Sequence, residues 1–356
     1  MRLETDCPDY RKAALLLMHE VNAYTQIKLS QEPSELSERL TGYPAKEEKI
    51  FPTSFHEQME AWLTDLQIDD QWQTIHQDVA VSLTTPSLLT NYLNSPAGSL
   101  PSPYSDFHHP LMNHVRVVYF GSSICPYLLP CAELLVQAIH KAQNEHLKPV
   151  LVLPPLMPSE YDRVTDVLRT IFLLVTPHPE VSLNDWGLVR FIHELDPAAT
   201  IELGPLLHRT ARDVRMPFLP PFPSDTSLHA DFYLDALHAW GVNRASAQCT
   251  EHPFNPLPIP FSLHLPFFQM NTSLNCTLRS TVFYHSRRHL VSTECSTKPC
   301  NSHAILYPSF LHMAGRYNSL FGYDRKCLSD SRYLRSLMGN TCDRLVLHLF
   351  EEVQDP

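Results

Sequence analysis

Glycine is scarce in this chain of 356 residues, which holds nine glycines against 31 prolines. We therefore expect stiff, proline-punctuated connections rather than flexible linkers. The chain also lacks any apolar run near the roughly 20 residues that a membrane-spanning helix needs. Its first residues, MRLETDCPDY, lack the apolar centre of a signal peptide. These absences predict a cytoplasmic protein without membrane insertion.

Basic side chains are in the minority. The chain has 27 Lys and Arg against 38 Asp and Glu, a net charge of −11 with neutral histidines. Binding to duplex nucleic acid requires a basic surface that neutralises phosphates, so this balance argues against it. The sequence also holds no Ser/His/Asp spacing and no HExxH motif, so the residues give classical peptidase chemistry no support. A small molecule is the expected partner.

Residues 1–110 read as a helical extension followed by a linker. Apolar side chains recur at helical spacing over residues 10–27, and residues 55–66 read as a second helix. Residues 94–110 hold four prolines, as expected of a loop. We predict that this extension packs against the rest of the chain or against a partner and supplies no catalytic group.

From residue 114 onward, short apolar runs alternate with amphipathic segments. This alternation predicts βα units around a parallel sheet. About seven strands over roughly 240 residues match the size of a (β/α)8 barrel, and a doubly wound sheet is the alternative. We predict an α/β domain resembling a (β/α)8 TIM barrel over residues 111–356, with its site at the carboxyl ends of the strands. The expected strands are residues 114–121, 148–155, 180–185, 200–207, 242–249, 259–268 and 344–350, and the expected helices are residues 132–144, 159–174, 186–195 and 231–241.

Polar residues lie at the ends of these expected strands. Asn184 and Asp185 are candidate catalytic residues that would position a substrate hydroxyl or a water. Asp185 has an alternative role as the N-cap of the helix that begins at residue 186. His264 alternates with apolar residues and is a candidate substrate-binding residue, with a satisfied core histidine as the alternative. Glycines at the strand ends would let the backbone approach a bound group closely and leave room for it.

Three of the nine cysteines form a set late in the chain: Cys276, Cys295 and Cys300. In a reducing compartment, clustered cysteines more often bind metal than form disulfides. The segment 276–300 is polar and lacks a helical pattern, which suits a loop whose thiolates converge on an iron–sulfur cluster. Buried thiols without a ligand are the alternative.

Five motifs, in their order and spacing, resemble the collagenase-like peptidase family thirty-two (U32), which has no established peptidase mechanism. This family includes iron–sulfur proteins of the UbiU/UbiV type from anaerobic ubiquinone biosynthesis. The resemblance covers about residues 114–348. Its motifs are VYFGSSICPYLLP, PEVSLNDWGLVRFI, IELGPLLHRTARDVR, HLPFFQMNTSLNC and ECSTKPC. The resemblance implies oxygen-independent hydroxylation of an aromatic or heterocyclic substrate, with a prephenate-type oxygen donor. It also implies a related barrel subunit as a heterodimer partner.

The same resemblance implies a [4Fe–4S] cluster. Matching motif to motif assigns its four ligands to Cys125, Cys276, Cys295 and Cys300. The last gap, C-x4-C, is one residue longer here than in the family. No ligand role is expected for the remaining cysteines, which are Cys7, Cys131, Cys249, Cys327 and Cys342.

The chain departs from the family at two strand ends. It reads Gly-Pro-Leu-Leu at residues 204–207, where many relatives carry Gly-Arg-Leu-Leu, and so it lacks an arginine that could grip a carboxylate. Arg209, Arg212 and Arg215 follow closely and are the expected substrate-binding cations. After the fifth strand, residues 244–247 read Arg-Ala-Ser-Ala instead of the usual acidic residues. A hydroxylase-like enzyme is favoured, and a peptidase-like hydrolase and a non-catalytic subunit are the alternatives.

Overall fold

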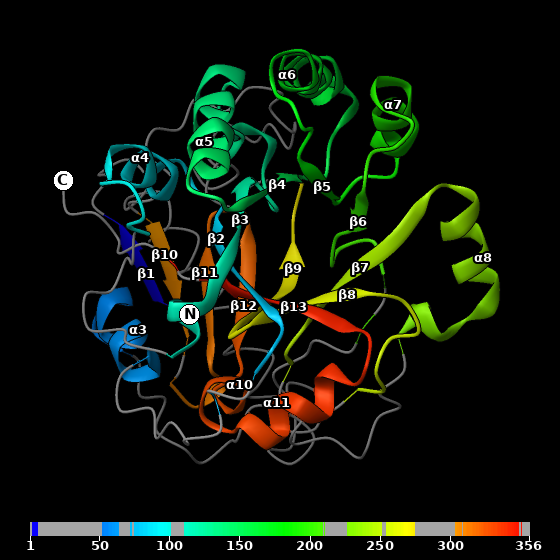
Figure 1. Cartoon of the computed structure of the whole chain (residues 1–356). Helices are drawn as coiled ribbons and strands as arrows, with labels where there is room; N and C mark the ends of the chain where they lie inside the picture. Colours follow the sequence, from blue (N-terminus) through cyan, green and yellow to red (C-terminus); the bar gives the residue numbers. More distant parts are fainter. Residues whose placement is uncertain are drawn as a thin grey trace, which may run out of the picture.

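The computed structural model describes residues 2–5, 52–63, 72, 75–100, 110–208, 210, 226–250, 254–274, 303–307, 309–348 and 350. Its centre is a closed barrel of eight parallel strands in the order β13-β2-β3-β4-β5-β6-β7-β8 (Figure 1). The strands are β2 (Asp78–Leu83), β3 (Val115–Gly121), β4 (Lys148–Leu153), β5 (Glu180–Leu183), β6 (Ile201–Leu203), β7 (Val242–Gln248), β8 (Phe261–Leu265) and β13 (Cys342–His348).

Helices surround this barrel, as Figure 1 shows for α4 to α8. The alternation of strand and helix confirms the α/β fold resembling a (β/α)8 TIM barrel. The observed α5 has the same bounds as the helix expected at residues 132–144. The helices are α3 (Phe55–Leu63), α4 (Pro86–Asn94), α5 (Ala132–Asn144), α6 (Tyr161–Leu174), α7 (Gly187–Leu195), α8 (Asp231–Ala239), α10 (Lys326–Ser329) and α11 (Ser331–Met338).

The barrel begins earlier in the chain than the sequence-based boundary at residue 111. Strand β2 lies within the expected helical extension and hydrogen-bonds to both β13 and β3. It is the eighth strand, and it closes the ring that the seven expected strands leave open. The helix expected at 55–66 is present as α3, and the one expected at 10–27 lies outside the described residues.

A second sheet packs beside the barrel. It is antiparallel, with strand order β1-β10-β11-β12-β9. Its strands are β1 (Arg2–Thr5), β9 (Phe267–Thr272), β10 (His303–Leu306), β11 (Met313–Arg316) and β12 (Ser319–Tyr323). The apolar run at 259–268, expected as one strand, is divided between β8 and β9. The break falls at Pro266, which has no N–H to continue the ladder and whose carbonyl accepts from Asp324 N.

The main hydrophobic core lies between the barrel strands and the helices. Residues facing outward from the strands, such as Val118 and Leu151, join helix residues such as Ile139 and Leu168 in one buried cluster. A smaller apolar cluster fills part of the barrel interior with residues of β2, β3, β4 and β13. Among the described residues, no helix is long and apolar enough to cross a membrane.

Candidate functional site

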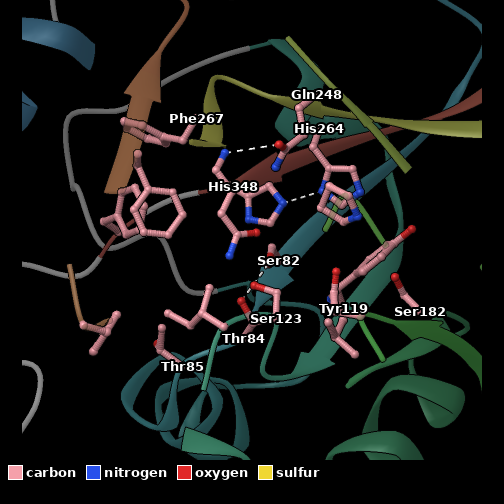
Figure 2. Close-up of a pocket in the computed structure, with 18 residues that line it drawn as sticks. Ser82, Thr84, Thr85, Tyr119, Ser123, Ser182, Gln248, His264, Phe267 and His348 are labelled. Atoms are coloured by element: carbon pink, nitrogen blue, oxygen red, sulfur yellow. Dashed lines mark hydrogen bonds between the residues drawn. The ribbon is translucent and has the colours of Figure 1, made fainter. Parts of the chain in front are cut away.

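A pocket opens at the carboxyl end of the barrel. Residues from β2, β3, β5, β7, β8 and β13 meet there (Figure 2). The cavity has a volume of about 50 Å³. A cavity that binds benzene is about three times larger, roughly 150 Å³. The pocket is lined by Ser82, Thr84, Thr85, Tyr119, Ser123, Ile124, Val152, Ser182, Asn184, Pro205, Gln248, His264, Phe267, Gln269, Tyr317, Phe321, His348 and Phe350.

Two histidines from neighbouring strands face each other in this pocket. His264 Nδ1 and His348 Nε2 lie 2.5 Å apart, within hydrogen-bond distance. The rings stack, with centroids 4.8 Å apart, and Tyr119 meets His264 edge-on. The second ring nitrogen of His264, Nε2, is buried and has no hydrogen-bond partner in the described part of the chain.

Both histidines are neutral at pH 7. Burial lowers the pKa of His348 to about 4. Burial also lowers the pKa of His264 well below its usual value, and His348, Arg344 and His208 add to this effect. One of the two facing nitrogens therefore carries a hydrogen and the other accepts it. Which of them carries the hydrogen determines the role of His264 Nε2. This atom accepts a proton if Nδ1 is the donor, and it carries a proton if Nδ1 is the acceptor.

A buried charge network lies beneath the pocket. Arg344 donates to both oxygens of Glu180, at 2.8 and 3.1 Å, and also to the Tyr119 hydroxyl at 2.8 Å. Arg244 contacts Glu180 at 3.2 Å and Glu202 at 3.5 Å. Lys148 also contacts Glu180 at 2.7 Å, and Asp343 contacts Arg244 at 2.9 Å. Among the described residues, the basic and acidic side chains of this network are therefore equal in number.

This network fixes the floor of the pocket. Tyr119 donates to Glu202 Oε2 at 3.1 Å while it accepts from Arg344. Burial raises the pKa of Tyr119 well above its usual value, and the charge of Glu202 raises it further. The phenol is therefore held neutral and in place, with its ring nearly perpendicular to that of His264.

The antiparallel sheet supplies an aromatic wall. Phe267 starts β9, Phe321 belongs to β12, and Phe350 follows β13. The ring of Phe350 contacts both others edge-on, each with centroids 4.7 Å apart. Next to this wall, Gln248 Oε1 accepts from the backbone N–H of Gln269 at 3.2 Å. No described lining residue carries a formal charge, because both histidines are neutral.

Asn184 lines this pocket, and its side chain is already used in holding the strand ends together. Its Nδ2 donates to Leu153 O at 3.1 Å, and its Oδ1 accepts from Leu206 N at 3.3 Å. A side chain on Gly204 would place Cβ 2.3 Å from Asn184 Oδ1. The space left by this glycine therefore belongs to Asn184, not to a bound group.

Asp185 does not line the pocket. Its Oδ1 accepts from Gly187 N at 2.8 Å, and its Oδ2 accepts from Leu156 N at 2.9 Å. These bonds secure the start of α7 and the loop after β4. This arrangement supports the capping alternative, one residue before the N-cap itself.

Cys125 lies in the loop after β3, directly after the lining residues Ser123 and Ile124. Cys125 is partly buried and packs against a small apolar cluster. Two members of this cluster, Ile124 and Tyr317, line the pocket. The other residues expected to hold a cluster or an anion lie outside the described residues. They are Cys276, Cys295, Cys300, Arg209, Arg212 and Arg215.

Sequence reasoning identified His264 and Asn184 but missed His348, Gln248 and Tyr119. One signal was available: polar side chains occupy every second position of strands that are otherwise apolar or small, as in Arg-Ala-Ser-Ala-Gln over 244–248. In a strand these positions share one face, and in this barrel that face is the interior. The tripeptide Leu-His-Leu also occurs twice in the sequence, at residues 263–265 and 347–349.

Comparison with known proteins adds one distant likeness of fold. No family model matches the chain, and no curated protein matches it significantly. Among solved structures, the chain is similar to one described as "The Structure of the U32 Peptidase Mk0906", at 8% sequence identity and a TM-score of 0.35. The likeness covers 78% of this chain and 94% of that one. At this level it is a likeness to a U32 peptidase in architecture alone and carries no argument about function.

Proposed function

We propose that the chain is an enzyme that binds a small uncharged molecule, or the polar edge of an aromatic or heterocyclic ring, in the carboxyl-end pocket. His264 and His348 would move a proton to or from it. The observation that carries this proposal is the buried neutral histidine pair, with Nε2 of His264 left without a partner in a cavity. A buried polar atom without a hydrogen bond costs free energy, and such atoms cluster where a ligand completes the site.

The histidine pair is suited to relay a proton. When His264 Nε2 takes a proton from a bound group, Nδ1 can pass its own proton to His348 Nε2 across 2.5 Å. The added proton then makes His348 an imidazolium. Because burial lowers the pKa of His348 to about 4, this charge is short-lived, and the proton returns along the same path to the bound group. Proton transfer by a positioned side chain contributes about 10²–10⁴-fold to a rate.

The lining residues favour a neutral ligand. A carboxylate in this pocket would meet no cation among the described lining residues, and a buried unpaired charge is expensive. The aromatic wall of Phe267, Phe321 and Phe350 suits a planar ring whose polar edge points to His264. The cavity volume is large enough for the polar edge of such a ring but not for the whole ring.

A serine-type hydrolase is less well supported. Ser82, Ser123 and Ser182 line the pocket, but in the described structure none of them hydrogen-bonds to His264 or His348. Among the described residues, the pocket lining also holds no carboxylate to orient a histidine. Activation of a serine nucleophile needs both contacts.

Phenol and benzoate test the pocket directly. We expect phenol to bind the full chain and benzoate to bind much more weakly, by calorimetry at pH 7. Changing His264 to Leu should weaken phenol binding about tenfold, the equivalent of one hydrogen bond near 1.4 kcal/mol. The matched control is His178→Leu, because that histidine pairs with Asp196 away from the pocket. Equal binding of phenol to the wild type and the His264→Leu variant would contradict the proposal.

We further propose that the same face carries a [4Fe–4S] cluster held by Cys125 together with Cys276, Cys295 and Cys300. A specific contact supports this placement. Asn318 Nδ2 donates to the carbonyls of Ile124 and Ser273, at 2.8 Å each. The residue before Cys125 is thus tied to a residue three positions before Cys276. Bound there, the cluster would supply electron transfer beside the pocket, with a potential set by its surroundings.

Anaerobic purification tests the cluster. We expect a brown protein, and we expect the Cys125→Ala variant to lose most of its iron and its visible absorbance. Cys131→Ser is the matched control, because that cysteine is exposed and lies outside the proposed ligand set. A Cys125→Ala variant as brown as the wild type would contradict this ligand assignment. A colourless wild-type protein with intact thiols would instead favour a non-catalytic subunit that pairs with a related barrel.

A further inference from the structure

We propose that Cys249, Asp324 and Cys327 form a buried binding site for a thiophilic divalent metal ion of the Zn²⁺ class. This site is separate from the carboxyl-end pocket and from the proposed cluster. The two thiols and the carboxylate offer three ligand atoms that all lie within 4.8 Å of one another. All three residues are completely buried.

The three ligands come from three different parts of the fold. Cys249 directly follows β7, and its N–H donates to His264 O in the neighbouring strand. Asp324 directly follows β12 of the antiparallel sheet, and Cys327 belongs to α10. A metal bound to all three would therefore join the barrel, the antiparallel sheet and the segment that leads into the last barrel strand.

The spacing is close to that of a tetrahedral thiolate site. A Zn–S bond of about 2.3 Å places two sulfurs of a tetrahedron about 3.8 Å apart, so ligand atoms within 4.8 Å need to close by about 1 Å or less. Two thiolates select zinc and related soft ions over Mg²⁺ and Ca²⁺, which prefer oxygen ligands. A water would complete the four-coordinate shell.

The carboxylate is held in a fixed orientation. Asp324 Oδ1 accepts from Lys326 N at 3.0 Å, and its Oδ2 accepts from the Tyr333 hydroxyl at 2.9 Å. Partners of this kind orient a metal ligand and raise its affinity.

Cobalt substitution of the full chain tests the site. We expect one Co²⁺ per chain, with a thiolate-to-cobalt charge-transfer band and the ligand-field bands of tetrahedral cobalt. Cys249→Ser and Cys327→Ser should remove that spectrum, whereas Cys342→Ser, a buried cysteine outside the group, should keep it. Cys125→Ala should also keep it, which separates this site from the proposed cluster.

Tyr333→Phe gives a graded test that keeps all three ligands. Loss of its hydrogen bond to Asp324 should weaken cobalt binding about 10–100-fold while the spectrum of the saturated site keeps its form. Two results would overturn the proposal. One is a wild-type chain that shows no thiolate-to-cobalt band, including one whose Cys249 and Cys327 are joined as a disulfide. The other is a band that persists in both cysteine variants.

Discussion

Replacing Arg344 with methionine is expected to lower the free energy of unfolding by about 3–5 kcal/mol, the usual cost of removing one partner from a buried ion pair. The guanidinium is held by both oxygens of Glu180 inside the barrel, where the two side chains are 3% and 1% exposed. Without Arg344, the Glu180 carboxylate remains buried and loses its bidentate partner. Urea unfolding followed by circular dichroism measures the change.

Two further variants distinguish the loss of the Arg344–Glu180 ion pair from a general destabilising effect of substitution. Arg190→Met removes an exposed ion pair with Glu194 and should cost less than about 1 kcal/mol. Adding Glu180→Gln to Arg344→Met removes the buried carboxylate that has lost its bidentate partner, so the double variant should be less destabilised than the sum of the two single variants. A cost for Arg344→Met as small as that for Arg190→Met would contradict this account.

The same pair gives stability a dependence on acid. Burial opposes ionisation of Glu180, but the Arg344 hydrogen bond and the charges of Arg344, Arg244 and Lys148 outweigh it and lower the pKa to about 2. A pKa lower in the folded state than in the unfolded state stabilises the fold above pH 4.5, and this contribution is lost as the pH falls towards 2. The shift corresponds to about 3 kcal/mol. This loss should be reduced in Glu180→Gln.

Changing Gly121 to alanine is expected to destabilise the chain by more than about 3 kcal/mol, because two separate costs add. Gly121 ends β3 with φ of +117°, a conformation that side chains rarely adopt. A Cβ there would also lie 2.2 Å from Val152 O, a backbone atom of the neighbouring strand. The close approach starts the loop that carries the lining residue Ser123 and, two residues later, Cys125.

Gly98 provides the matched control for this substitution. It also has a positive φ, +77°, but a Cβ there meets nothing within 4 Å. Gly98→Ala therefore measures the conformational cost alone, about 1 kcal/mol. Thermal unfolding of the two variants should separate the clash from the conformation. Equal losses of stability would mean that β4 shifts at no cost and that the close approach is unimportant.

Local sequence patterns determined most of the barrel. Hydrophobic periodicity located all the barrel strands except β2, and it located α5 to α8 to within a few residues. These signals depend only on neighbours along the chain, because a strand repeats every two residues and a helix every 3.6. Asn184, expected at a strand end, and His264, expected within a strand, both line the pocket.

The tertiary structure alone decided which distant residues meet. β2 is a barrel strand because it pairs with β13, which lies more than 250 residues later, and no local signal encodes that pairing. His264 and His348 are 84 residues apart, and Cys249 meets Asp324 and Cys327 only where α10 packs on the barrel. The room beside Gly204, expected for a ligand, is filled by Asn184. Contacts of this kind depend on strand register and on barrel closure, which are fixed only when distant strands pair. The sequence therefore predicted individual residues of the site, and the fold brought them together.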